Sequence, residues 1–285
     1  MRLILGVIVC VVFALLISCK KYAPAPDAFF LRINSINVST NPKQGSGAHK
    51  IVDLHLYVNG FFQGAYPVGS AMPIVTNNKQ VKIEILPGIK NNGISDTRVF
   101  WRIYNEVRFD TLVESGKTID RRLTFVYKES ANFPWIEGFE SNTVSGYSIE
   151  KSPESQVRPR IIQTDSSFEG KYLEIALTGD TIIGQIQSSG EGYVLPKTNE
   201  NVYLELNYRC NQTFVVGMMT QTNQLKPIIY LKEQKDWNKI YIQLSTVLNT
   251  EPLSEKNKIY FRLLKEASDP TAWIHLDNIK LVYLQ

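Results

Sequence analysis

The chain has 285 residues and carries 31 Lys and Arg against 27 Asp and Glu, a formal net charge of +4. Its basic residues are spread along the chain without a dense block, which argues against nucleic acid as a partner. About 260 residues follow the apolar leader, enough for one large domain or two ordinary domains.

The leader predicts export. Arg2 is followed by an uncharged stretch from Leu3 to Ile17, which is too short to span a bilayer comfortably. The tetrapeptide Leu16-Ile17-Ser18-Cys19 resembles the lipobox of bacterial lipoproteins. That resemblance implies removal of a signal peptide, residues 1–18, and acylation of Cys19 by fatty acids such as palmitate. The alternatives are a plain secretory signal peptide or a short membrane anchor, in which Cys19 is incidental.

A tether is predicted over residues 19–27, where Pro and Ala alternate before Asp27. More than one acyl chain would hold such a chain stably at a membrane surface. Lys20 and Lys21 stand where an Asp often signals inner-membrane retention, so the lipoprotein resemblance implies an outer-membrane address. Whether the chain faces the periplasm or the cell surface is left open.

Residues 28–133 predict a first all-β domain. Val52, Leu54, Leu56 and Val58 alternate with polar residues, and Asn59-Gly60 then predicts a hairpin turn. A second alternating run, Val81–Ile85, is expected to stop at Pro87-Gly88. The other predicted strands cover 29–36, 98–104, 109–113 and 118–127. Their number and spacing predict an antiparallel sandwich of immunoglobulin type. The stretch from Leu56 to Pro67, followed by Val81 to Gly88, resembles the small surface domains called PEGA domains.

Residues 134–285 predict a second all-β domain, beginning after a Pro-stopped turn near Pro134. Its predicted strands cover 135–140, 170–175, 202–208, 213–219, 236–242, 258–264 and 272–281. The order Phe-Glu, Gly-x-x-Leu, Trp-x-x-Ile and a closing Leu-Asp-Asn-Ile resembles the galactose-binding-like jelly rolls of carbohydrate-binding modules. The resemblance implies a jelly-roll fold.

The same resemblance implies two site features. Glu140 and Asp277 match the positions where such modules often hold a structural calcium ion, although calcium needs six to eight oxygen ligands. The alternative is that both carboxylates bond neighbouring loops without metal. Aromatic rings are the usual means of stacking on sugars, and Tyr193, carried by a Gly-rich loop, is the candidate ligand-binding residue. Trp135, Trp237, Trp273 and Tyr230 are further aromatic candidates, for which core packing is the competing interpretation.

No catalytic signature is found. The three histidines, His49, His55 and His275, lack metal-ligand spacing, and Cys210 lies in a strand-like run that predicts a buried, inert thiol. We therefore expect no catalytic residues, no certain cofactor and no enzyme. The expected function is a non-catalytic, lipid-anchored cell-envelope protein that recognises a glycan or a surface protein through its jelly roll. The alternatives are a structural subunit of an envelope secretion or surface-assembly complex, and a glycan-active hydrolase.

Overall fold

The computed structural model describes residues 26–141, 146–197, 202–250 and 255–285. The predicted signal peptide, Cys19 and nearly all of the predicted tether lie outside these residues. Among the described residues, no helix is long and apolar enough to cross a membrane. This part of the chain is almost entirely β, with one short helix, α2 (Ser245–Leu248), so the predicted all-β class with two sandwiches is confirmed.

The first sandwich packs a three-stranded sheet on a five-stranded sheet. The first sheet has the order β4 (Ala71–Thr76), β1 (Asp27–Ser39), β8 (Thr118–Val126). The second has the order β3 (Phe61–Pro67), β2 (Asp53–Val58), β5 (Gln80–Lys90), β6 (Arg98–Phe100), with β7 (Val107–Leu112) also paired to β5. Alternating residues such as Leu31, Leu56 and Ile83 are buried between the two sheets. Each strand thus places one apolar face inward.

Two predictions about the first sandwich have different outcomes. The hairpin at Asn59-Gly60 is confirmed, since both residues have positive φ (51° and 83°) and Val58 pairs with Phe61. The predicted end of a strand at Pro87-Gly88 is wrong, because β5 continues to Lys90. Pro87 lies where β5 changes partner from β7 to β6, a place where its missing N–H is tolerated.

The second sandwich packs a five-stranded sheet on a six-stranded sheet. The first has the order β10 (Ile149–Lys151), β13 (Ile183–Ser188), β18 (Lys258–Leu264), β15 (Phe214–Met219), β16 (Leu225–Leu231). The other has the order β11 (Arg160–Ile162), β12 (Tyr172–Thr178), β19 (Thr271–Leu284), β14 (Val202–Cys210), β17 (Gln234–Gln243), with β9 (Ala131–Glu137) also paired to β19. A separate apolar core fills the space between these sheets.

The predicted start of the second domain at residue 134 lies inside β9. This strand pairs with the C-terminal half of β19, and the register shifts between Leu281 and Tyr283. Phe133 and Pro134 fall in that irregularity at the edge of the sheet, where a residue without an N–H breaks no ladder. Pro134 therefore interrupts β9 without ending it.

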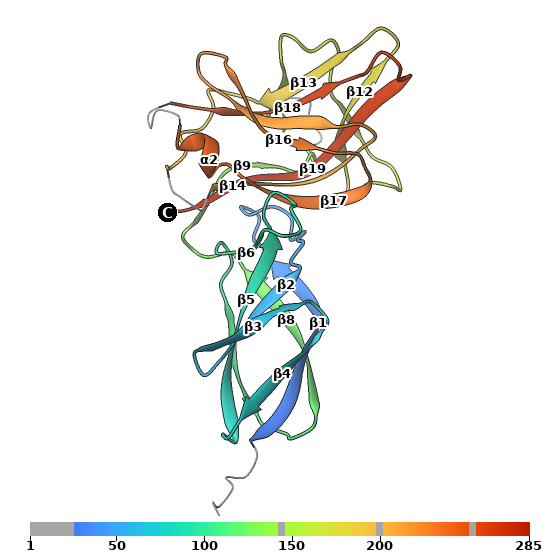
Figure 1. Ribbon diagram of the computed structural model, residues 1–285. Coiled ribbons are helices and arrows are strands. Elements are labelled where there is room, and N and C mark those ends of the chain that lie inside the picture. The colour runs from blue at the N-terminus through green and yellow to red at the C-terminus, as the bar shows by residue number, and fades with distance from the viewer. Residues whose placement is uncertain (1–25, 142–145, 198–201, 251–254) are drawn as a thin grey trace, which may run out of the picture.

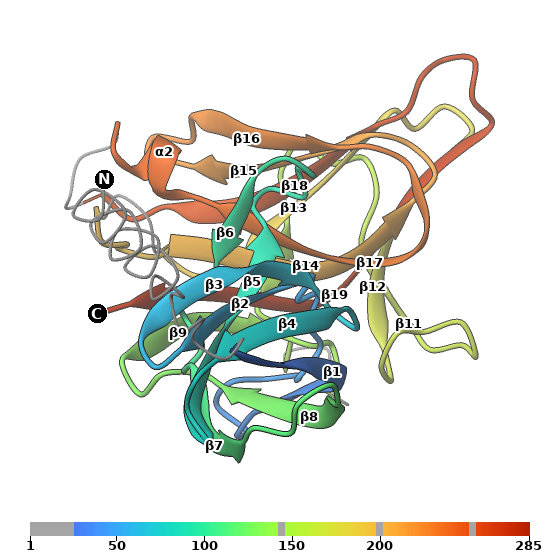
Figure 2. The same ribbon diagram turned by 60° about the horizontal axis from the view of Figure 1, so that its bottom comes forward.

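The first sandwich meets the second end-on, against the outer face of the six-stranded sheet (Figures 1 and 2). Tyr203 of β14 and Tyr241 of β17 point away from their own core and join the core of the first sandwich. The Trp101 ring lies 4.7 Å from the Tyr203 ring and 4.6 Å from the Tyr241 ring, centroid to centroid. The two sandwiches thus share an apolar contact.

Charged groups are buried beside this contact. Glu205, Lys239 and Lys280 are each at most 6% exposed, and Lys239 Nζ lies 3.0 Å from Glu205 Oε2. Lys280 Nζ donates to the Tyr127 hydroxyl (3.1 Å), which donates to Glu205 Oε1 (3.1 Å). Because Tyr127 follows β8 and the other three residues belong to the second sandwich, this junction cluster links the two.

Candidate functional site

Beyond the junction, the outer face of the six-stranded sheet carries rings and charges. On β19, Ala272, Ile274 and Leu276 enter the core, so Trp273 and His275 point outward. The same alternation turns other side chains of the sheet outward, and Phe168 from the loop before β12 joins them. We call this set the aromatic face: Phe168, Tyr172, Glu174, Arg209, Trp237, Trp273 and His275.

The rings of the aromatic face contact one another. The centroids of Trp273 and His275 are 4.4 Å apart with nearly parallel planes. Tyr172 lies 4.6 Å from His275 and 5.4 Å from Trp237, and Phe168 lies 6.1 Å from Trp237. The Arg209 guanidinium lies 5.0 Å from the centre of the Trp237 ring, within cation–π range. These rings form one connected aromatic platform, in which the planes are inclined to one another, by 75° between Tyr172 and Trp237.

A row of polar groups crosses this platform because strand register brings them side by side. His275 pairs with Glu174 on β12 and with Arg209 on β14. Arg209 Nε donates to His275 Nδ1 (2.8 Å), and the opposite ring nitrogen lies 2.9 Å from Glu174 Oε2. Burial lowers the pKa of His275, with the Glu174 hydrogen bond opposing it and Arg209 adding to it. A neutral imidazole that accepts from Arg209 and donates to Glu174 fits this arrangement.

Several groups of the aromatic face remain open to solvent. Phe168 is 38% exposed, Trp237 and Trp273 are partly exposed, and Trp237 Nε1 donates to the Ser166 carbonyl (2.8 Å). Flat apolar rings beside an Arg and a Glu offer stacking and hydrogen bonding to one ligand.

The aromatic residues singled out from the sequence lie in three places. Trp237 and Trp273 belong to the aromatic face. Tyr193 and Trp135 lie together at the rim of the second core, with ring centroids 6.2 Å apart, and burial raises the pKa of Tyr193 to about 12. Tyr230 is 63% exposed on the opposite sheet. The residues that sequence patterns did not indicate are Arg209, Glu174, Tyr172 and Phe168. A signal was present for two strands, because Tyr172-x-Glu174 and Trp273-x-His275 each place two aromatic or charged residues on one face of a strand.

The side chains of Glu140 and Asp277 both accept hydrogen bonds from the short segment 169–171. Glu140 Oε1 accepts from the Lys171 N–H (2.8 Å), and Asp277 Oδ2 accepts from the Glu169 N–H (3.4 Å). Asp277 is fully buried, and burial, with added repulsion from Glu169 and Glu140, raises its pKa to about 8. These are oxygen donors suited to calcium. Among the described residues, however, no group of three or more His, Cys, Asp or Glu side chains has the geometry of a metal site. The calcium ion stays a prediction.

Cys210 lies in the core of the second sandwich, fully buried. Its thiol donates to the Lys232 carbonyl (3.3 Å), and burial raises the pKa of Cys210 to about 11. A thiol that stays protonated is a poor nucleophile.

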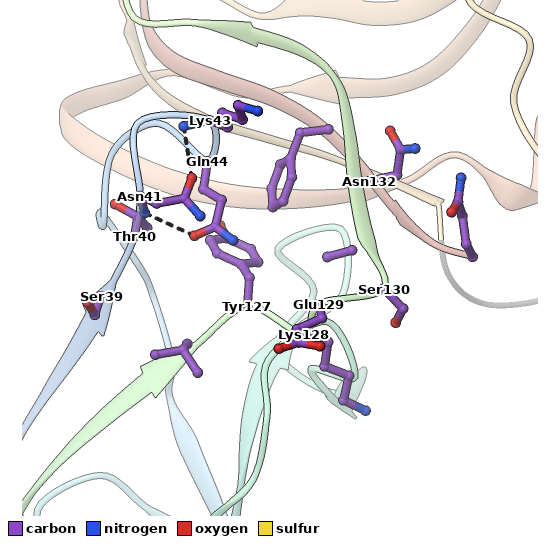
Figure 3. A pocket seen from close by; sticks show the side chains of 14 residues that line it. Ser39, Thr40, Asn41, Lys43, Gln44, Tyr127, Lys128, Glu129, Ser130 and Asn132 are labelled. Atoms are coloured by element: carbon purple, nitrogen blue, oxygen red, sulfur yellow. Dashed lines mark hydrogen bonds between the residues drawn. The ribbon is translucent and has the colours of Figure 1, made fainter.

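A cavity of about 750 Å³ lies where the connection from β8 to β9 passes the loop after β1 (Figure 3). Asn41 and Gln44 line it, but their side-chain oxygens accept from the backbone N–H groups of Lys43 (2.9 Å) and Asn41 (3.1 Å). These polar groups stabilise their own loop.

Comparison with known proteins finds no matching family model and no matching curated protein. Similar solved structures include a family 11 carbohydrate-binding module from Clostridium thermocellum in complex with a β-1,3-1,4-mixed-linked tetrasaccharide. It has 16% identity and a TM-score of 0.35, covering 53% of this chain and 94% of that one.

A second similar structure comes from a study of promiscuous specificity in the β-sandwich carbohydrate-binding modules. It has 13% identity and a TM-score of 0.38, covering 90% of this chain and 98% of that one. An exo-β-agarase is similar over 52% of this chain but only 25% of its own, with 14% identity and a TM-score of 0.40. The first two of these structures are carbohydrate-binding modules, and the third is an enzyme.

Proposed function

We propose that this protein is a non-catalytic glycan-binding protein and that the aromatic face of the second sandwich is its binding surface. The observation that carries this proposal is the cluster of partly exposed rings, Trp237, Trp273 and Phe168, on one sheet face. Partly exposed rings that lie together lose their water at little conformational cost when an apolar surface covers them. The carbon-bound hydrogens of a pyranose ring form such a surface.

The row of polar groups formed by Glu174, His275 and Arg209 would fix the orientation of the bound sugar. Arg209 is held by His275 and by the Ser166 hydroxyl (3.0 Å), and Glu174 is held by His275 on one oxygen and by an ion pair with Arg160 on the other, so both groups are positioned before a ligand arrives. A guanidinium donates and a carboxylate accepts, which matches the two hydrogen-bonding roles of a sugar hydroxyl. Groups fixed in advance lose little freedom on binding.

The cellular setting is a second part of the proposal. We infer that the chain is exported, cleaved before Cys19 and acylated there, and that it resides at the outer membrane. Support comes from the lipobox-like tetrapeptide Leu16-Ile17-Ser18-Cys19 and from Lys20 after the cysteine. Metabolic labelling with a fatty-acid analogue tests it, since Cys19→Ala should remove the label.

The test of glycan binding is an array of polysaccharides probed with the purified full chain in detergent. We expect saturable binding to at least one polymer, and at least about tenfold weaker binding by Trp237→Ala and by Trp273→Ala. Tyr230→Ala is the matched control, because it removes an exposed ring from the opposite sheet. Far-ultraviolet circular dichroism should show all three variants folded.

Two outcomes would contradict the proposal. Absence of binding to every polymer would remove the glycan function. Loss of binding in Tyr230→Ala, with Trp237→Ala unaffected, would keep the function but move it to the other sheet.

A further inference from the structure

A second cavity, of about 300 Å³, lies where the two sandwiches meet, and we call it the junction pocket. The first sandwich contributes His55 of β2, Asn91 and the strand β6, while the second contributes Tyr203 and Gln243. The volume is at the lower end for small-molecule sites, which form often at domain interfaces. The pocket is separate from the aromatic face.

Two residues of its wall have unused hydrogen-bonding groups. His55 and Asn91 are each 8% exposed. Within the described parts of the chain, neither ring nitrogen of His55 has a hydrogen-bond partner, and neither does Oδ1 of Asn91. Buried polar atoms without a partner in the protein are rare in folded proteins, because leaving such an atom unpaired costs free energy. A molecule bound in the pocket could supply the missing partners.

The charged residues of the wall are basic. Arg98 and Arg102 line the pocket and no lining residue is acidic. Arg98 also forms an ion pair with Asp53 through Nη1 and donates from Nε to the Ser95 carbonyl (3.2 Å), so its Nη2 group is the one that a ligand would use. Burial lowers the pKa of His55, so its ring is neutral at neutral pH and combines one donor with one acceptor. Guanidinium groups pair with carboxylates in a planar, two-bond geometry. The wall therefore favours an anion of that shape.

An apolar surface completes the wall. The Phe100 ring lies 4.2 Å from the His55 ring, centroid to centroid, and Val99 and Ile103 flank it. We propose that the junction pocket binds a small organic carboxylate of the size of one sugar acid. Arg98 and Arg102 hold its carboxylate, its ring packs beside Phe100, and its hydroxyl groups pair with His55 and Asn91.

The test is a titration of the full chain in detergent with glucuronate, followed through the imidazole resonances of His49, His55 and His275. Glucose is the control ligand that lacks the carboxylate, and inorganic phosphate is the control anion that lacks the planar shape. We expect the His55 signals to shift saturably with glucuronate only. Arg102→Gln should weaken binding at least about tenfold, as loss of a charge-assisted hydrogen bond does. Arg108→Gln, which removes an exposed arginine of β7 outside the pocket, should leave binding unchanged.

Each other result would overturn the proposal. An unmoved His55, or equal weakening in Arg102→Gln and Arg108→Gln, would show that the pocket does not hold the carboxylate. Equal binding of glucose or phosphate would refute the ligand class. A shift at His275 alone would place the ligand on the aromatic face. Because Trp237→Ala should leave the His55 shift intact, this proposal and the glycan-binding proposal can fail separately.

Discussion

At the scale of single residues, the junction cluster holds two lysines and one glutamate away from water. Burial lowers the pKa of Lys280 to about 8, with Lys239 adding to the effect and Glu205 opposing it. Buried ion pairs commonly cost as much free energy in lost hydration as their attraction returns. Glu205 is the group on which both cations depend, whereas Lys280 is the second cation beside a single carboxylate.

We therefore expect Glu205→Gln to lower the free energy of unfolding by about 3–5 kcal/mol, because two buried ammonium groups lose their counter-charge. Lys280→Met should be neutral or stabilising at pH 7. Between pH 8 and 10.5 folded Lys280 has lost its proton while unfolded Lys280 retains it, so the stability of the unmodified protein should rise with pH in this window. The stability gain of Lys280→Met over the unmodified protein should then shrink. Urea unfolding across this pH range measures the free energy of unfolding of both proteins. A stability difference that stays constant with pH would contradict the lowered pKa of Lys280.

At the scale of elements, Asp277 of β19 and Glu140 after β9 are both bound to the segment 169–171. Gly170 packs so closely there that an added Cβ would lie 2.2 Å from Glu140 Oε1. A calcium ion at this place would fasten the closing strand to the loop before β12.

The jelly-roll resemblance predicts that about 1 mM Ca²⁺ raises the melting temperature relative to chelator, within the affinity range of extracellular calcium modules. Asp277→Asn should remove the increment, while Asp236→Asn, at an exposed position of β17, should keep it. Equal melting temperatures with calcium and chelator would leave the backbone N–H groups as the partners of both carboxylates.

Strands with strict alternation could be predicted from sequence, as Leu54, Leu56 and Val58 show in β2. Others could not. Strand β13 reads Ile-Gly-Gln-Ile-Gln-Ser, and Gln185 and Gln187 are buried although their side chains are polar. Its burial depends on neighbours far along the chain. The aromatic face was missed for the same reason, because Glu174, Arg209 and His275 meet only through the register of three strands.

At the scale of the whole molecule, the core of the first sandwich includes Tyr203, Tyr241 and Val282 of the second. Backbone contacts add to this, since Asn92 N–H donates to the Tyr241 carbonyl (2.9 Å). Domains joined by a shared apolar core are expected to unfold together.

Calorimetry should accordingly give one transition for the unmodified chain. Trp101→Ala should cost about 3–5 kcal/mol, as for large buried aromatics, and should separate the transition into two. Phe61→Ala is the matched control, because Phe61 is 74% exposed and its loss should leave one transition. Two transitions in the unmodified chain would contradict a shared core.

The direction and length of β1 decide how far the second sandwich would lie from a membrane anchor at Cys19. Strand β1 begins at the end of the first sandwich remote from the second (Figure 1). Its 13 residues, at about 3.3 Å each, span on the order of 40 Å. If the chain is anchored at Cys19, the first sandwich would separate the second sandwich from the anchored end by about that length. In a chain anchored in this way, the second sandwich would lie at the end of the first that is remote from the anchor, and the aromatic face would lie on the sheet surface that contacts the first sandwich.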